Sequence, residues 1–349
     1  MDISVVVSIF NEKESLRELV SGIRENLDGA NLSYEIIMVS DGSTDGSWEE
    51  IQAMAKEHLA STSSESQTSS SANAASECPN GQIHGICFRR NYGKSAALYC
   101  GFEAARGDVV ITMDADLQDD PKELPELYRM VKEEGYDLVS GWKKKRYDNT
   151  FTKNIPSKIY NATARRVTGI KLHDMNCGLK AYKNEVVKNI EVYGEMHRYI
   201  PFLAKEAGFS KIGEKEVTHH KRKFGKSKFG MNRFVNGYLD LMTLWFLQKF
   251  GKKPMHLFGV WGTLMFLAGG VIALWIIIRK LVLQSMMSSQ IAAQGFTDIK
   301  LRAVTDQPLF YLALLAIILG AMLFLTGFIA ELISRNSSQR NSYKIKDRI

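Results

Sequence analysis

Short runs of aliphatic residues alternate with amphipathic segments over the first 140 residues of the chain. Runs of four to seven residues that are rich in Val, Ile and Met predict β-strands, and the segments between them carry apolar residues at helical spacing. The predicted strands are 3–9, 34–39, 83–88, 109–113 and 137–140, and the predicted helices begin at Glu12, Asp45, Gly93 and Pro121. This alternation predicts an α/β domain whose mostly parallel sheet has helices on both faces.

The pattern changes after residue 256. Residues 257–278 and 309–330 form two apolar runs, each of 22 residues without a charge. A helix of that length spans roughly 33 Å, which is close to the thickness of the hydrocarbon core of a bilayer. Buried core helices seldom stay uncharged on every face over such a length. We therefore predict two transmembrane helices within a membrane anchor at 254–335, which makes this a multi-pass membrane protein in contact with the lipid bilayer.

Basic residues flank these two runs unevenly. Lys249, Lys252 and Lys253 precede the first run, and five Lys or Arg residues lie within 335–349, whereas the segment between the runs holds four. The positive-inside rule therefore places the N-terminal domain and a basic tail, 336–349, in the cytoplasm, with the protein in the cytoplasmic (inner) membrane. The segment 231–253 is predicted to be juxtamembrane and amphipathic, and either lies in the membrane interface or packs against the domain.

Composition narrows the class of protein. Apolar residues make up 45% of the chain, charged residues 24%, and the net charge is +7, which excludes a disordered or collagen-like chain. The four cysteines show no CxxC spacing, which predicts a reducing compartment and no structural metal. Much of the positive charge lies beside the apolar runs, so no nucleic-acid partner is predicted. Half of the residues in 61–76 are Ser, and we predict a flexible surface insertion at 61–79.

Four polar loops follow the first four predicted strands. They are Asn11-Glu12, the DGSTD sequence that begins at Asp41, the RRNYGKS sequence at 89–95 and the DADLQDD sequence at 114–120. Any one of them could simply cap the helix that follows it. In a parallel sheet, however, ligands bind beyond the carboxyl ends of the strands. Four such loops at one edge therefore indicate a binding site.

The DADLQDD loop is the most informative of the four. Asp114, Asp116 and Gln118 present oxygen atoms at alternate positions, which suits a hard cation such as Mg²⁺ or Mn²⁺ that carries a diphosphate. The loop is not an EF-hand, because Asp119 stands where that motif needs Gly and Pro125 where it needs Glu.

These loops resemble glycosyltransferase family 2, which has the GT-A fold. Further motifs are similar to one branch of it, the polyprenyl-phosphate glycosyltransferases related to dolichol-phosphate mannose synthase and to bacterial undecaprenyl-phosphate sugar transferases. They are SGWKKKR (140–146), HDMNCGLKAY (173–182), HRYIP (197–201) and HHKRKFGKSKFG (219–230). The resemblance runs over roughly residues 3–235 and implies a GT-A domain at 1–230.

The resemblance also implies substrates and site residues. One sugar would pass from a nucleotide-diphosphate sugar to a polyprenyl phosphate, which is undecaprenyl phosphate in the bacterial members of the branch, and Asp116 and Asp174 would be catalytic. Asn11, Glu12, Asp41, Lys94 and Asp114 would bind the nucleotide sugar, Asp114, Asp116 and Gln118 the metal, and Lys143, Arg146, Arg222 and Lys228 the acceptor phosphate. Lys143 stands where the family pattern has Arg, and Lys lacks the bidentate fork of Arg. The alternative for the basic clusters is contact with anionic lipid headgroups.

The chemistry needs little help from a base. The second pKa of a phosphate monoester is about 6, so the acceptor is mostly a dianion at neutral pH, and direct displacement would invert the anomeric configuration.

The alternative is a processive or other family 2 enzyme that makes a cell-surface polysaccharide, but a Q/RxxRW motif is absent around all five tryptophans. A non-enzymatic tether would not need the acidic loop. The sugar, the nucleotide, the polyprenyl length and the presence of a homo-oligomer stay open.

Overall fold

The computed structural model describes residues 1–65, 81–144, 165–224 apart from 167, 254–294, 303–336 and 345–348, together with 242, 246 and 250. The chain divides into two compact units. One unit contains Met1–Leu241 and Gln339–Ile349, and the other contains Met242–Ser338. The last residues of the chain therefore belong to the N-terminal unit.

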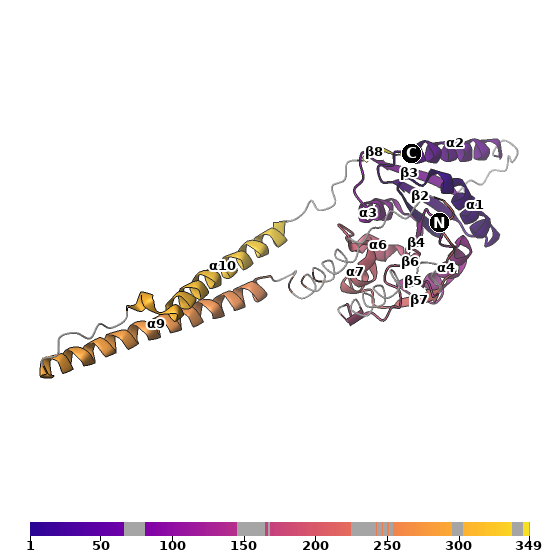
Figure 1. The fold of residues 1–349 in the computed structure, drawn as a ribbon. Helices are drawn as coiled ribbons and strands as arrows, with labels where there is room; N and C mark the ends of the chain where they lie inside the picture. Colours follow the sequence, from indigo (N-terminus) through magenta and orange to yellow (C-terminus); the bar gives the residue numbers. More distant parts are fainter. Residues whose placement is uncertain are drawn as a thin grey trace. The chain divides into compact units, whose positions relative to one another are not determined.

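The N-terminal unit is built on an eight-stranded mixed sheet of order β7-β5-β6-β4-β1-β2-β3-β8 (Figure 1). The parallel pairs are β1–β2, β2–β3, β1–β4 and β5–β7, and the antiparallel pairs are β4–β6, β5–β6 and β3–β8. The strands are β1 Ile3–Ile9, β2 Tyr34–Ser40, β3 Gln82–Phe88, β4 Val109–Asp114, β5 Leu138–Trp142, β6 Lys180–Lys183, β7 Ile212–Glu216 and β8 Ile345–Arg348. The predicted α/β class is confirmed, and the five predicted strands are present.

Helices cover both faces of this sheet because the strands are apolar on both sides. Val5 and Val7 of β1 lie in one core cluster with Leu16, Met54 and Leu124, which come from α1, α2 and α4. On the other face α3 approaches so closely that a Cβ on Gly101 would clash with the Val6 side chain. The helices are α1 Lys13–Gly29, α2 Ser47–Glu65, α3 Lys94–Ala104, η1 Pro121–Glu123, α4 Leu124–Lys132, α6 Asn184–Asn189, η3 Met196–Tyr199 and α7 Ile200–Glu206.

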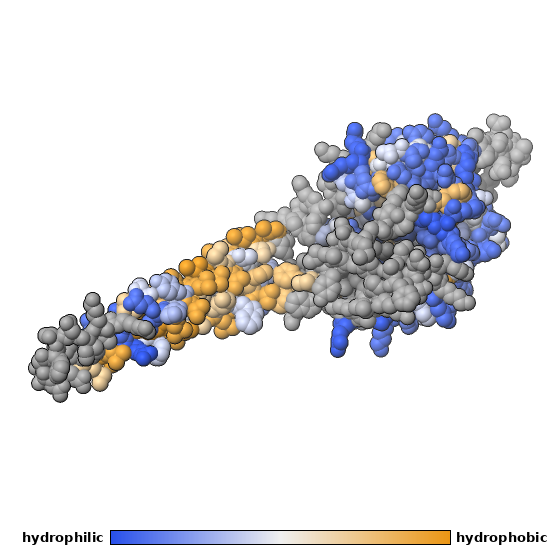
Figure 2. Space-filling model, in the orientation of Figure 1, coloured by the Kyte–Doolittle hydropathy of each residue, from blue (hydrophilic) through white to orange (hydrophobic). Residues whose placement is uncertain are grey.

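The second unit is a pair of long apolar helices, α9 Met255–Gln294 and α10 Pro308–Asn336, with η4 Val304–Asp306 before the second. The stretches Met255–Met286 and Pro308–Ala330 are long and apolar enough to cross a membrane, with mean hydropathies of 2.1 and 2.6. Figure 2 shows their apolar surface. The helices touch backbone to backbone, since a Cβ on Gly262 would lie 2.7 Å from the Gly320 carbonyl oxygen. The chain thus has two candidate membrane spans, where the sequence predicts them.

Three features differ from the sequence-based prediction. Residues 61–65 were expected in the flexible insertion but form the last part of α2, and the rest of that insertion, 66–79, lies outside the described residues. Strands β6, β7 and β8 were not predicted, because at least half of the residues in short segments such as KAYK and IKDR are charged. The tail, expected as a separate basic segment, contributes β8 to the sheet. Most of the juxtamembrane segment 231–253 also lies outside the described residues.

Candidate active site

The loops after β1 and β2 are joined to each other by side-chain hydrogen bonds. Asn11, whose φ is +54°, accepts a hydrogen bond from the Thr44 amide on Oδ1 at 2.7 Å, and its own amide donates to Ser43 Oγ at 3.1 Å. The Asp45 carboxylate accepts from the Lys13 amide at 3.0 Å, at the start of α1. These contacts hold the two loops as one unit at the carboxyl edge of the sheet.

Asp41 connects the second loop to the third. Its Oδ1 accepts from the Tyr92 amide at 2.7 Å and its Oδ2 from the Gly93 amide at 2.9 Å. Burial raises the pKa of Asp41, and the two amides act against that rise. Gly42 permits the close approach, since a Cβ there would lie 2.5 Å from the Asn91 amide nitrogen. Both oxygens of Asp41 therefore hold the RRNYGKS loop in this structure.

Lys94 and Asp114 form an ion pair at the centre of this edge. Lys94 begins α3 and its Nζ contacts Oδ1 of Asp114, the last residue of β4. Burial opposes ionisation of Asp114, but the charge of Lys94 outweighs it and lowers the pKa of Asp114 to about 2. Gly178 packs against the same carboxyl group, where a Cβ would lie 2.7 Å from the carboxyl carbon. Asp114 is thus held as a carboxylate, and the side of it that faces Gly178 has no space for a further methyl group.

Asp116 lies two residues further on, in a tight turn. Leu117 has a φ of +57°, and the Gln118 amide donates to Asp116 Oδ1 at 3.2 Å. Arg222 bridges the site, with one nitrogen 2.8 Å from Asp116 Oδ2 and another 3.0 Å from Glu12 Oε1. Burial and the charge of Asp114 raise the pKa of Asp116, and Arg222 partly offsets them. Among the predicted site residues, the structure brings Glu12, Asp114, Asp116, Lys94 and Arg222 to one edge of the sheet.

The HHKRK segment, residues 219–223, lies beside the acidic DADLQDD loop, residues 114–120. Asp119 and His219 form an isolated antiparallel bridge, and the His220 amide donates to the Gln118 carbonyl at 2.8 Å. His220 Nε2 also lies 3.0 Å from Asp120 Oδ2. This pairing of main chains carries Arg222 to Asp116 across 106 residues of sequence.

The remaining predicted acceptor residues are placed differently. Lys143 Nζ lies 2.6 Å from Asp119 Oδ1, and the Asp119 side chain is fully buried. Burial opposes the charged form of Lys143, but Asp119 outweighs it and raises the pKa of Lys143. Lys143 is therefore already paired inside the protein. Arg146 and Lys228 lie outside the described residues.

Asp174 lies in the loop that packs on Asp114. Only 2% of Asp174 is exposed, its amide donates to Glu214 Oε1 at 3.0 Å, and its Oδ1 accepts from the Asn176 amide at 3.1 Å. The same loop continues to Gly178, which contacts Asp114. Asp174 therefore shapes the loop whose Gly178 packs on Asp114.

Two residues at this edge, Lys180 and His197, were not singled out from the sequence. Lys180, on β6, is 3% exposed, its Nζ contacts the Cys177 carbonyl, and burial lowers the pKa of Lys180. His197 Nδ1 lies 3.1 Å from Ser95 Oγ, and burial, followed by the charge of Lys94, holds the pKa of His197 well below its usual range. Both residues lie within motifs of the family resemblance, HDMNCGLKAY and HRYIP, and that was the signal that could have identified them.

The side chains of the site can be compared with the ligands that a divalent cation needs. Among the residues that the structure describes, no group of three or more His, Cys, Asp or Glu side chains is arranged to hold a metal ion. Asp114 and Asp116 nevertheless face one region closely enough for the charge of one to raise the pKa of the other. Two adjacent carboxylates fit a hard cation whose other ligands come from water or a phosphate. Gln118 contributes a backbone turn beside them.

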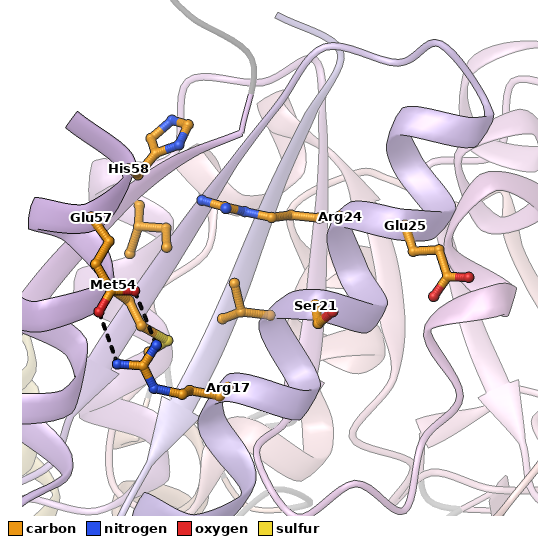
Figure 3. A pocket seen from close by; sticks show the side chains of 9 residues that line it. Arg17, Ser21, Arg24, Glu25, Met54, Glu57 and His58 are labelled. Atoms are coloured by element: carbon orange, nitrogen blue, oxygen red, sulfur yellow. Dashed lines mark hydrogen bonds and ion pairs between the residues drawn. The ribbon is translucent and has the colours of Figure 1, made fainter. Parts of the chain in front are cut away.

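A cavity of about 580 Å³ lies elsewhere, between α1 and α2 (Figure 3). Arg17 and Glu57 line the cavity and form a bidentate ion pair, with both contacts at 3.0 Å. Arg24 and His58 also line it. Its lining residues belong to helices and to the first half of β3, and none belongs to the four polar loops. The cavity is therefore separate from the cluster around Asp114.

Residues 4–191, more than half of the chain, match glycosyl transferase family 2. The chain belongs to this family and is a glycosyltransferase. It is 33% identical to dodecaprenyl-phosphate galacturonate synthase of Rhizobium johnstonii over 96% of this chain and 88% of that protein. It is 34% identical to the undecaprenyl-phosphate 4-deoxy-4-formamido-L-arabinose transferase of Shewanella sediminis over 80% of this chain and 76% of that one.

The fold is also similar to a solved structure, glucosyl-3-phosphoglycerate synthase from Mycobacterium tuberculosis in complex with Mn²⁺, UDP and glucosyl-3-phosphoglycerate. The TM-score is 0.49 and the identity 17%, over 70% of this chain and 78% of that one.

Proposed function

We propose that this glycosyltransferase moves one sugar from a nucleotide-diphosphate sugar to a polyprenyl phosphate, at the cytoplasmic face of a membrane, with a divalent cation and with inversion at the anomeric carbon. The observation that carries the proposal is the cluster of Asp114, Asp116, Lys94 and Arg222, two carboxylates and two cations that meet at the carboxyl edge of the sheet. The two candidate membrane spans and the polyprenyl-phosphate substrates in the names of the relatives support a lipid acceptor.

The charges of the cluster suit a transfer between two phosphates. A phosphate oxygen of the acceptor attacks the anomeric carbon, and the bond between that carbon and the diphosphate breaks, so the electron pair leaves with the diphosphate. No proton has to be removed, because the acceptor oxygen is already anionic at neutral pH.

Each charged residue then has a separate task. Asp114 and Asp116 would hold Mg²⁺ or Mn²⁺, which supplies Lewis-acid stabilisation of the departing diphosphate when it is bound. Lys94 keeps Asp114 ionised and would contact the diphosphate. The positive charge of Arg222 balances the negative charges of Glu12 and Asp116. Its guanidinium would also bind the acceptor phosphate. Arg146 and Lys228 stay proposed acceptor contacts, whereas Lys143 would have to exchange Asp119 for a phosphate.

The position of the C-terminal strand supports a common side for the domain and the tail. β8 follows both candidate spans in the sequence, yet it pairs with β3, which precedes them. A strand cannot pair across a bilayer, so this pairing supports a single side for the domain and residues 345–348. The distribution of Lys and Arg favours the cytoplasm for that side.

The experiment is a transfer assay with the full chain in lipid vesicles. A panel of labelled nucleotide sugars is offered with polyprenyl phosphate, polyprenyl diphosphate or no acceptor, and each reaction is repeated with EDTA. We expect label in the lipid fraction only with the monophosphate and only with Mg²⁺ or Mn²⁺. Equal transfer to the diphosphate, or full activity in EDTA, would contradict the proposal.

A further inference from the structure

The C-terminal strand β8 pairs with β3 just before the loop that Asp41 holds. Arg348 faces Ile86, Asp347 faces Cys87 and Ile345 faces Phe88, with an irregularity between Cys87 and Phe88. Without β8, these last residues of β3 would form the open edge of the sheet, with unpaired backbone groups. Edge pairing by a separate segment is a common way in which one stretch of chain fixes another.

Phe88, at the end of β3 that pairs with β8, is connected to the active site by a series of short contacts. Phe88, 1% exposed, packs edge-on against Tyr92 with ring centroids 5.6 Å apart, and the Arg90 guanidinium lies 4.6 Å from the centre of the Tyr92 ring. The Tyr92 amide then donates to Asp41 at 2.7 Å. Two residues later Lys94 pairs with Asp114. The loop between β3 and α3 is thus fixed at one end by Asp41 and begins, at its other end, where β8 holds Phe88.

We propose that β8 is a positioning element of the active site, in which the tail of the same chain clamps the end of β3 and so sets the RRNYGKS loop and Lys94 for the nucleotide sugar. The role assigned to the loop rests on the proposed function, whereas the pairing itself does not. Three of the four β8 residues are charged, which suits a final edge strand because charge there discourages further pairing.

This role separates β8 from the acceptor side of the reaction. Arg222 reaches Asp116 from the HHKRK segment, whose pairing with the acidic loop does not involve β3. Loosening β8 should therefore disturb binding of the nucleotide sugar and leave binding of the lipid phosphate nearly intact. A purely structural role would instead reduce the amount of folded enzyme and leave both KM values unchanged.

The kinetic test compares two variants of the full chain at one position. Asp347→Pro removes a backbone N–H from the strand, and Asp347→Ala, the matched control, removes only the side chain. For the proline variant we expect the KM for nucleotide sugar to rise about 2- to 10-fold, which is the effect of losing one net hydrogen bond, with the acceptor KM unchanged. The alanine variant loses the same side chain but keeps the N–H, so its KM for nucleotide sugar should rise less than that of the proline variant. Equal KM values in the proline variant and the wild type, or a rise in the acceptor KM alone, would overturn the proposal.

A cross-link tests the pairing without any reference to activity. Cys87 faces residue 347, and directly opposed residues of antiparallel strands have Cα atoms about 4.5–5.5 Å apart, within the range for a disulfide. In a Cys78→Ser background, Asp347→Cys is oxidised with diamide, which takes two electrons and two protons from the two thiols. We expect a disulfide within one chain, seen as a linked peptide from a monomer band. A dimer band would assign the strand to a second copy, and no disulfide would remove the pairing; either result overturns the proposal.

Discussion

Gly178→Ala adds one methyl group next to the carboxyl group on which the account depends. A Cβ on this residue would lie 2.7 Å from the Asp114 carboxyl carbon and 3.0 Å from Oδ1. The loop cannot easily retreat, because the Gly178 carbonyl accepts a hydrogen bond from Thr112 Oγ1 at 2.8 Å. The Asp114 carboxylate therefore has to move, and its ion pair with Lys94 moves with it.

The expected loss of stability and the expected loss of turnover differ in size. Overpacking of this kind costs about 1–3 kcal/mol, which lowers the Tm of a domain of this size by roughly 2–12 °C. A displacement of about 1 Å at a reacting centre can cost on the order of 10²-fold in rate. We expect Gly178→Ala to fold and to lose turnover by roughly that factor.

The assay measures sugar transfer and thermal unfolding of the same preparations. Gly29→Ala is the matched control, because a Cβ at Gly29 meets nothing within 4 Å. It should keep the turnover and the Tm of the wild type. If Gly178→Ala also turned over like the wild type, Asp114 would have no part in the reaction.

Three further predictions concern single residues of the domain. Asp116→Ala should reduce metal-dependent turnover by about 10²-fold or more, because the departing diphosphate loses its stabilisation; near-normal turnover with added Mg²⁺ or Mn²⁺ would remove Asp116 from the site. Arg222→Ala should raise the acceptor KM about 10- to 150-fold, equivalent to about 1.5–3 kcal/mol, with a much smaller effect on nucleotide-sugar binding, and an unchanged acceptor KM would refute that contact. Burial opposes ionisation of Glu35, but hydrogen bonds from Ser4 and Arg106 lower its pKa, so its stabilising contribution is present above the unfolded pKa of about 4.3 and is lost as the pH falls through the lower folded pKa. In thermal unfolding between pH 7 and pH 3, Glu35→Gln should therefore lose less stability than the wild type, and equal losses would contradict this reasoning.

The strands that position the site could be predicted from the sequence because their aliphatic runs are continuous. β1 was predicted with its observed bounds, and the observed ends of β4 and β5 differ from the predicted ones by one or two residues. β6 could not be predicted, since two of its four residues, Lys180 and Lys183, are charged although the strand is buried. β8 could not be predicted either, because its partner lies more than 250 residues away in the sequence.

The site was predictable to a similar extent. Asp114 and Asp116 follow a predicted strand, so their place at the carboxyl edge follows from the parallel order of the sheet. The contact of Arg222 with Asp116 depends on a tertiary pairing of two loops, which no local pattern contains. The partner of Lys143 was missed for the same reason, because Asp119 looks like any polar loop residue until the structure shows that it is buried.

The central claim is that the acceptor is a phosphate on a lipid and that one sugar is added to it. The most direct measurement is mass spectrometry of the lipid product that the purified chain makes from polyprenyl phosphate and the nucleotide sugar it accepts. We expect a polyprenyl monophosphate that carries one sugar, whose anomeric configuration is opposite to that of the donor. A polymer, or a sugar on a lipid diphosphate, would contradict it.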